Sequence, residues 1–280
     1  MHSFPRLSRI IAVAGVAALA VTLAACAPAA ETADDAASGY VTDGKLTIAT
    51  GEPAFFPWVI DDAPESGEGF ESAIAYAVAE ELGFAAEDVV WVRTTFDEAI
   101  APGPKAFDFN LQQFSITEER RAAVDFSSPY YETTQAVITT EASAAAGATS
   151  IADLKDLLIG AATGTTSFDA IESQIAPTAG AQAFNSNDDA KLALESGQVD
   201  AIVVDLPTAF FLTAVELTGG LIIGQLAAST GGDAFGLVLA KDSPITAAVT
   251  AAVDALRASG RLQEIADEWL ADATNAPVLQ

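Results

Sequence analysis

Residues 107–131, FDFNLQQFSITEERRAAVDFSSPYY, contain the most informative pattern in this chain. Thr117 suits a helix N-cap, and Glu118 and Glu119 then occupy the first turn, where negative charge complements the helix dipole. Arg120 and Arg121 lie at the unfavourable end of that dipole, so we expect at least one of the two guanidinium groups to have another partner. The parallel N–H groups of a guanidinium match a carboxylate, and for Arg120 pairing with an acidic side chain on a solvated face is the alternative.

A second stretch is similar to the start of this one. Residues 105–113, KAFDFNLQQ, and residues 197–205, GQVDAIVVD, each contain a short turn, an aspartate and a buried strand that ends in polar residues. Open α/β sheets bind ligands beyond the carboxyl ends of their strands. We therefore expect two sheets whose strand ends face one shared cleft.

The hydrophobic pattern from Lys45 onward predicts an α/β fold with mixed sheets, because β-branched apolar runs alternate with stretches of helical period. The expected strands are 46–50, 89–92, 107–111, 159–163, 201–205, 221–226 and 235–240. The expected helices are 73–82, 168–175, 188–196, 207–217, 245–259 and 262–270. The part of the chain that follows the N-terminal segments is long for a domain with one hydrophobic core and long enough for two lobes.

The N-terminus predicts export. Arg6 and Arg9 precede an apolar run at 10–25, which is shorter than the about 20 residues of a permanent membrane helix. Leu-Ala-Ala then precedes Cys26, the only cysteine, so no intrachain disulfide forms. We expect residues 1–25 to be a cleaved signal peptide. An ordinary secretory signal with an incidental cysteine is the alternative.

The segment that follows, residues 26–43, predicts a flexible spacer. Apart from Tyr40 it lacks large apolar side chains, and it shows no periodicity. We expect it to connect the N-terminal cysteine to the folded body.

The composition excludes several classes of function. The net charge is −27, with 39 acidic side chains against 12 basic ones, and loss of residues 1–25 brings it to −29. Nucleic acids and anionic lipid surfaces would repel such a chain. The only histidine, His2, leaves with the signal, which removes Ser-His and Cys-His nucleophile pairs and the usual ligands of zinc. We therefore expect no metal and no cofactor, although carboxylate chemistry remains possible.

Two motifs resemble those of known proteins. D-x-x-x-x-x-x-S-I-T-x-x-R, followed by D-F-S-x-P-Y-Y, resembles the polar amino-acid-binding proteins, the family 3 extracellular solute-binding proteins of bacterial ABC importers, and the resemblance covers residues 44–271. The residues before Cys26 resemble the lipobox of bacterial lipoproteins, which implies that Cys26 becomes the lipidated first residue on the outer face of the cell membrane.

The resemblance implies a two-lobed, periplasmic-binding-protein-like fold that closes on its ligand like a hinged trap. Residues 44–131 and 236–280 would form the first lobe and residues 132–235 the second. The two crossing segments would map to 132–136 and 231–235.

The resemblance also assigns the first lobe's side of a binding site. Arg120 would bind the α-carboxylate of an amino acid, and Ser115 would contact its α-amino and carboxyl groups. Phe55 and Phe96 match two aromatic positions that enclose the ligand side chain, although aromatic residues are more often core. Gln113 stands where the family usually has a small residue that offers a backbone contact.

In the second lobe, Thr165 and Thr166 belong to a Gly-Thr-Thr turn between a strand and a helix, where free N–H groups and hydroxyls suit a carboxylate. An ordinary helix cap is the alternative. Asp205 matches the family carboxylate that takes the α-ammonium group, and a charge at the end of a buried strand needs a partner. The alternative is an N-cap for the helix after it.

Glu52 and Glu71 match positions that approach the distal end of the ligand in relatives. Two carboxylates beside two aromatic rings favour a cationic tip, so we expect arginine, lysine or ornithine, with glutamine or histidine as close alternatives. The second aspartate of the family's G-F-D-x-D string is Ala73 here, which weakens this expectation.

The resemblance implies a monomer that is not an enzyme and that delivers its amino acid to the permease and ATPase of an importer. Two other classes remain open. Some dehydratases resemble this fold, and Glu52 or Glu71 would then serve as an acid above a cyclic substrate. An amino-acid-sensing surface lipoprotein is the second.

Overall fold

The computed structural model describes residues 39–228, 233–270 and 276–280. The chain divides into two units, 1–36 and 37–280, and every described residue belongs to the second. The predicted signal peptide, Cys26 and most of the predicted spacer lie outside the described residues. No helix within the described ranges is long and apolar enough to cross a membrane.

The first sheet has five strands in the order β2-β1-β3-β12-β4. Their bounds are β1 Leu46–Gly51, β2 Val89–Thr94, β3 Phe109–Asn110, β4 Val124–Phe126 and β12 Val238–Ala240. β1 is parallel to β2 and β3, whereas β12 is antiparallel to β3 and β4. The predicted strand 235–240 is therefore two strands in the structure. Residues 238–240 form β12 of this sheet, and residue 235 ends the separate strand β11 (Asp233–Phe235).

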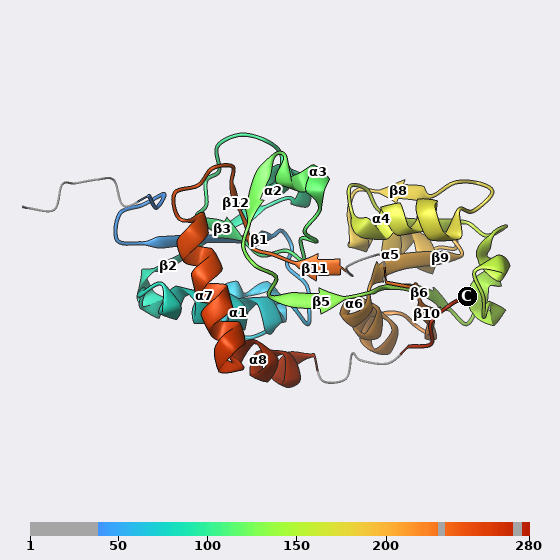
Figure 1. Cartoon of the computed structure of the whole chain (residues 1–280). Helices are drawn as coiled ribbons and strands as arrows, with labels where there is room; N and C mark the ends of the chain where they lie inside the picture. Colours follow the sequence, from blue (N-terminus) through green and yellow to red (C-terminus); the bar gives the residue numbers. More distant parts are fainter. Residues whose placement is uncertain (1–38, 229–232, 271–275) are drawn as a thin grey trace, which may run out of the picture. The chain divides into compact units, whose positions relative to one another are not determined.

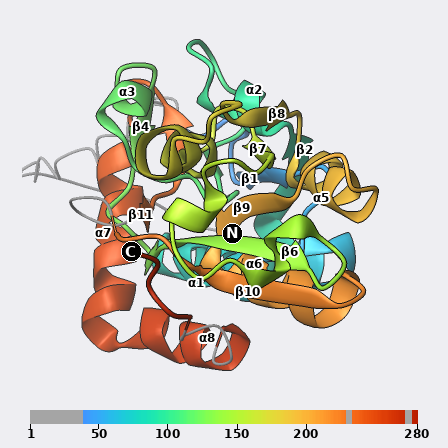
Figure 2. The same ribbon diagram turned by 90° about the vertical axis from the view of Figure 1, so that its right-hand side faces the viewer.

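Helices cover both faces of this sheet. One face packs against α1 (Phe70–Glu81), α7 (Thr246–Ser259) and α8 (Arg261–Trp269), whose apolar sides form one buried cluster with β1 and β3. Figures 1 and 2 show α7 leading directly into α8 beside α1. The short α2 (Phe96–Ile100) and α3 (Glu118–Arg121) follow strand ends near a second, smaller cluster.

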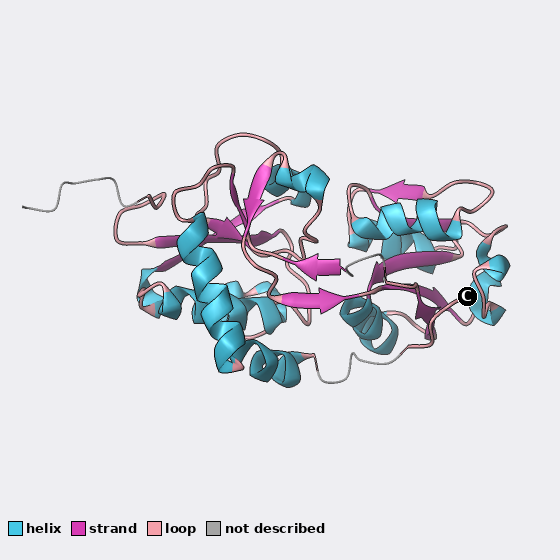
Figure 3. Cartoon of the chain, viewed as in Figure 1, coloured by secondary structure: helices cyan, strands magenta, loops and turns pink. Residues whose placement is uncertain are grey.

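The second sheet has the strand order β10-β6-β9-β7-β8. Its strands are β6 Gln135–Thr140, β7 Ile159–Ala162, β8 Gln182–Phe184, β9 Ala201–Asp205 and β10 Gly220–Gln225. Its helices are α4 Thr166–Ala170, α5 Asn187–Glu195 and α6 Leu206–Phe211. Each of α4 and α6 is followed directly by its own π-helical turn. Two buried clusters lie on its two faces, and Figure 3 shows the helices flanking both groups of strands.

Two strands connect the sheets. β5 (Tyr131–Thr133) and β11 (Asp233–Phe235) form an antiparallel pair that runs between the two groups of elements in Figure 1. We expected a crossing segment at 132–136, but its last two residues belong to β6 and pair with β9. β6 lies inside the sheet between β10 and β9, and the sequence analysis did not predict it as a strand.

Side chains of the two lobes also contact each other directly. Here the first lobe means the first sheet with its helices, and the second lobe means the second sheet with its helices. The buried indole Nε1 of Trp58 donates to Thr208 Oγ1 at 3.0 Å, from the first lobe to α6. The rings of Phe56 in the first lobe and Phe211 in α6 also lie together, with their centroids 4.5 Å apart.

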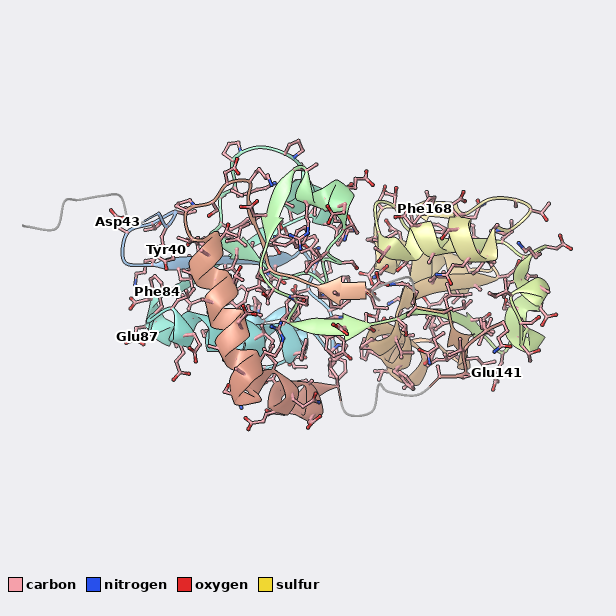
Figure 4. The ribbon with its side chains drawn as sticks, in the orientation of Figure 1. Tyr40, Asp43, Phe84, Glu87, Glu141 and Phe168 are labelled. Atoms are coloured by element: carbon pink, nitrogen blue, oxygen red, sulfur yellow. The ribbon has the colours of Figure 1, made fainter. Side chains whose placement is uncertain are left out.

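The end of the predicted spacer is held against the first lobe. The ring of Tyr40 meets the ring of Phe84 edge-on with centroids 4.9 Å apart, and Figure 4 shows the two residues together. The backbone N–H of Val41 donates to Asp108 Oδ1 at 2.7 Å. The prediction of a flexible spacer is therefore wrong for its last residues, because aromatic packing and a carboxylate fix them.

The C-terminal residues return to the second lobe. Gln225 at the end of β10 donates its N–H to Pro277 O and accepts from Leu279 N, at 2.8 and 2.9 Å. Leu279 is 3% exposed and joins a core cluster of the second sheet. We expected residues 236–280 to lie wholly in the first lobe, and residues 276–280 correct this expectation.

Gly224 makes room for this C-terminal segment. A Cβ atom at this position would lie 2.6 Å from Pro277 O and 2.8 Å from Leu279 Cγ. We expect Gly224→Ala to lower the free energy of unfolding by about 1 to 3 kcal/mol, the usual cost of inserting atoms into packed structure. Urea denaturation of the purified protein measures this change.

Gly147→Ala is the matched control, because a Cβ there would meet nothing within 4 Å. It should leave the stability unchanged or slightly higher. Equal stability of the two variants would contradict tight docking of the C-terminal segment.

Candidate functional site

A cavity of about 190 Å³ lies where strand ends of both sheets meet. A cavity of about 150 Å³ accommodates a benzene molecule, so this one suits a small metabolite. The structure places nine of the ten predicted ligand-site residues on its wall: Glu52, Phe55, Phe96, Gln113, Ser115, Arg120, Thr165, Thr166 and Asp205. Their contact with a ligand stays a prediction.

Arg120 is the buried cation of this wall. Thr117 caps α3 as predicted, since its Oγ1 accepts from the backbone N–H of Arg120 at 3.1 Å. The guanidinium donates through Nη1 to Ser115 O at 2.7 Å and through Nη2 to Gly164 O at 2.8 Å. Its carbon lies 5.2 Å from the ring centre of Phe96. The side chain is therefore fixed by backbone from both lobes.

The solvated-face alternative for Arg120 is wrong. The residue is only 8% exposed, and the ion pairs found among the described residues do not include it. Burial lowers the pKa of Arg120, and the charges of Asp169, Asp205 and Asp233 oppose this shift. The guanidinium remains charged, because an arginine keeps its proton in proteins.

Hydroxyl groups from the two lobes meet beside Arg120. Ser115 Oγ and Thr166 Oγ1 are 3.1 Å apart, although they come from different lobes. The hydroxyl of Thr165 instead caps α4, accepting from Phe168 N and donating to Ala162 O. The cap alternative is therefore confirmed for Thr165, and Thr166 has its hydroxyl at the junction of the lobes.

Phe55 and Phe96 reach the cavity from the first lobe. Phe96 begins α2, whose start is fixed by a capping box between Thr95 and Glu98. Its ring also packs on the buried ring of Phe114, with centroids 4.6 Å apart. Phe55 packs partly against the main core of the first lobe. Both rings thus have one side supported by the core, which leaves them rigid walls for a ligand.

Asp205 ends β9 and forms part of a hydrogen-bonded group. Although it stands at the N-cap position of α6, its side chain makes no capping bond, so the cap alternative is wrong. Its Oδ1 accepts from Gln135 Nε2 at 2.8 Å, and the same nitrogen donates to Asp233 Oδ2 at 2.8 Å. Withdrawal from water, followed by the charge of Asp233, raises the pKa of Asp205 to about 8.

Sequence reasoning missed Gln135 and Asp233 as members of this site. Both lie within the predicted crossing segments, which placed their backbone at the junction of the lobes. The motifs gave no sign that their side chains would meet Asp205, since Gln135 and Asp233 are 98 positions apart.

Glu71 is the predicted site residue that the cavity wall does not include. It is 1% exposed and accepts hydrogen bonds from Tyr130 Oη and from both the backbone N–H and the side-chain amide of Gln113. Gln113 has a φ of 51°, an unusual backbone conformation, and its two hydrogen bonds to Glu71 stabilise it. Glu71 thus contacts Gln113, a residue of the cavity wall. Its position does not support direct contact with a ligand.

A metal centre is not evident in the described part of the chain, where no three His, Cys, Asp or Glu side chains gather in a suitable group. The polar atoms of the cavity are instead one guanidinium, carboxylates, hydroxyls and amides. Such a set binds a small polar molecule by charge and hydrogen bonds.

The chain is similar to a family of known proteins. The model of the bacterial extracellular solute-binding proteins, family 3, matches residues 46–272. The chain is 30% identical over 226 residues to the L-arginine-binding protein of Pseudomonas aeruginosa, which covers 78% of this chain and 85% of that protein.

Two solved structures have the same fold. One is an ancestral arginine-binding protein bound to arginine, with 28% identity, a TM-score of 0.66 and coverage of 81% of this chain and 98% of that one. The other is an ancestral amino-acid-binding protein described as a precursor of cyclohexadienyl dehydratase. It has 27% identity, a TM-score of 0.67 and coverage of 81% and 95%.

The buried carboxyl group of Glu71 should make stability depend on pH. Burial raises the pKa of Glu71 from 4.5 to about 7, against the hydrogen bonds from Tyr130 and Gln113. The folded form then holds the proton more tightly, so its stabilising effect is complete below pH 4.5 and is lost as the pH rises through 7. Between pH 5 and pH 8 the wild type should lose about 2 to 3 kcal/mol relative to Glu71→Gln.

Urea unfolding of both proteins at the two pH values measures this difference. The glutamine variant serves as its own control, because other titrating groups are common to both chains. Parallel pH profiles would show that Glu71 does not titrate in this range.

Proposed function

The chain belongs to the bacterial extracellular solute-binding proteins of family 3, and we propose that it captures a polar L-amino acid for an ABC importer. The observation that carries this proposal is the arrangement of opposite charges in one cavity. Arg120 comes from the first lobe and Asp205 from the second, and both line the cavity. A zwitterion has the complementary pair of charges, a carboxylate and an ammonium group.

The proposed binding mode divides the head group between the lobes. The α-carboxylate would take the remaining N–H groups of Arg120, since only two of its five donors are assigned to backbone carbonyls in the contacts above. The α-ammonium would lie on Asp205. Ser115 and Thr166 would add their hydroxyls, and a ligand that contacts both lobes favours the closed arrangement.

The side-chain preference is proposed as cationic, with arginine first. Glu52 lines the cavity with an exposed carboxylate, and Phe55 and Phe96 supply ring faces for a cation. The relative from Pseudomonas aeruginosa is named for L-arginine, and one structural relative was solved with arginine bound. Glu71 no longer supports this preference, because it does not line the cavity.

Binding is favoured over catalysis. Glu71 is the glutamate whose raised pKa would suit a general acid, but it contacts Gln113 and does not line the cavity. The structural relative described as a dehydratase precursor is itself named an amino-acid-binding protein. Turnover of cyclohexadienyl acids by the purified protein would contradict a purely binding role.

Removal of the Arg120 guanidinium should break the proposed site. We expect Arg120→Ala to weaken binding of L-arginine by about 3 to 5 kcal/mol, because the ligand carboxylate would be buried without its charged partner. Isothermal titration calorimetry at pH 8 measures this loss.

Arg121→Ala is the matched control, because Arg121 is the next residue of α3 and is half exposed beside Glu118. It should bind as the wild type does. Near-wild-type affinity of Arg120→Ala would refute the proposed carboxylate site. Titration with L-glutamine and L-glutamate completes the experiment, and tighter binding of either would refute the cationic preference.

We further propose that the mature protein is attached to the outer face of the cell membrane through Cys26, where it delivers its ligand to a permease. The predicted signal peptide and the extracellular family support this location, and a sensing role is the alternative. Cys26→Ser should move the protein from the membrane fraction to the soluble fraction of expressing cells. Immunoblotting of the two fractions checks this, and retention of the variant in the membrane would contradict lipid attachment.

A further inference from the structure

The amide of Gln135 joins two carboxylates beside the cavity. Its Nε2 donates to Asp205 and to Asp233, at 2.8 Å in each case, and its Oε1 accepts from Ser167 Oγ at 2.5 Å. The reversed amide would direct an oxygen at both carboxylates, so the observed orientation is the favourable one. Strands β6, β9 and β11 and helix α4 thus contribute one side chain each.

The charged surroundings of Asp205 are predominantly negative. The titratable and charged groups that act on it or respond to it are Asp233 on β11, Glu71 on α1, Arg120 on α3, Tyr131 at the start of β5 and Tyr130 just before it. Around Asp205 there is thus one guanidinium for three carboxyl groups, those of Asp205, Asp233 and Glu71. Two N–H groups of this guanidinium already bind backbone carbonyls. A group of like charges withdrawn from water lowers its energy by keeping a proton.

We propose that the free protein holds a proton on Asp205, within the group formed by Asp205, Gln135 and Asp233, and that the arriving α-ammonium displaces it. The inference rests on the proposed function and adds proton release to it. The O–H bond of Asp205 breaks, its electron pair stays on the carboxylate, and the proton passes to a solvent base. An N–H···O bond from the ligand replaces it.

Gln135 and Asp233 act on this step as positioning residues with opposite effects. The charge of Asp233 favours the protonated form of Asp205, whereas the hydrogen bond from Gln135 favours the ionised form. Arg120 favours the ionised form as well. The proton affinity of Asp205 is therefore set by residues on two further strands and on α3.

The direction of the pH effect follows from competition between proton and ammonium. With the pKa of Asp205 at about 8, about 0.9 proton should leave per ligand bound at pH 7. The apparent affinity should increase about 50-fold from pH 6 to pH 8, because the ionised fraction of Asp205 rises over this range. A site without a titrating carboxyl group would bind equally at both values.

Calorimetry with L-arginine at pH 7, in phosphate and in Tris, measures the number of protons released, because the two buffers differ in ionisation enthalpy. Asp233→Asn should reduce the release and move the pH dependence of affinity to lower pH. Gln135→Met should move it to higher pH. A merely structural role would change stability without shifting these profiles in opposite directions.

Asp169→Asn is the matched control. Asp169 lies near Arg120 but makes no hydrogen bond to Gln135 and is not among the groups that shift Asp205. This variant should release as many protons as the wild type. An equal reduction in Asp169→Asn and Asp233→Asn would overturn the assignment to Asp205.

The wild-type protein alone also decides the inference if a variant fails to fold. Carbon-13 NMR titration of aspartate-labelled, ligand-free protein should show one carboxyl group with a pKa near 8 that becomes ionised on addition of L-arginine. Binding without proton release, or a pKa of Asp205 near its ordinary value of 3.8, would overturn the inference and leave the proposed function intact. Absence of binding by L-arginine, L-glutamine and L-glutamate would overturn both.

Discussion

The site depends on the immobilisation of one guanidinium by backbone from both lobes. Arg120 donates to Ser115 O in the first lobe and to Gly164 O in the second, while Phe96 covers its face. A long flexible side chain loses several rotatable degrees of freedom when it binds a ligand. Here the contacts of the protein fix the side chain beforehand, so binding does not have to order it again. The same two hydrogen bonds link the first lobe to the second beside the cavity.

Local chemistry in the sequence was sufficient to predict the start of this site. The cap at Thr117 and the need of an arginine there for another partner followed from helix N-terminal preferences. The structure confirms the cap and gives Arg120 backbone partners in both lobes. Many of the strands and helices followed from hydrophobic period, whereas short elements such as β4 and β8 did not. β6 (QAVITT) was not predicted as a strand; its first two residues were assigned to a crossing segment, although its first five residues are buried.

The remaining parts of the site depend on tertiary contacts that no local pattern contains. Gln135 and Asp233 meet Asp205 because β6 begins beside the end of β9 and β11 begins at Asp233. Glu71 matched a motif position, but the left-handed backbone at Gln113 places an amide against its carboxylate. A motif thus identifies which residues come close to the cleft, whereas packing decides which of them line it.

The C-terminal residues also affect how the molecule meets others of its kind. β10 is one of the two outer strands of the second sheet. Val278 lies alongside its last residue, Gln225, in a parallel bridge, and Gln225 is hydrogen-bonded to the C=O of Pro277 and the N–H of Leu279. Unpaired outer strands are templates for association with another chain. Residues 276–280, which lie beyond the part of the chain that the family model matches, therefore shield part of this edge from association with another chain.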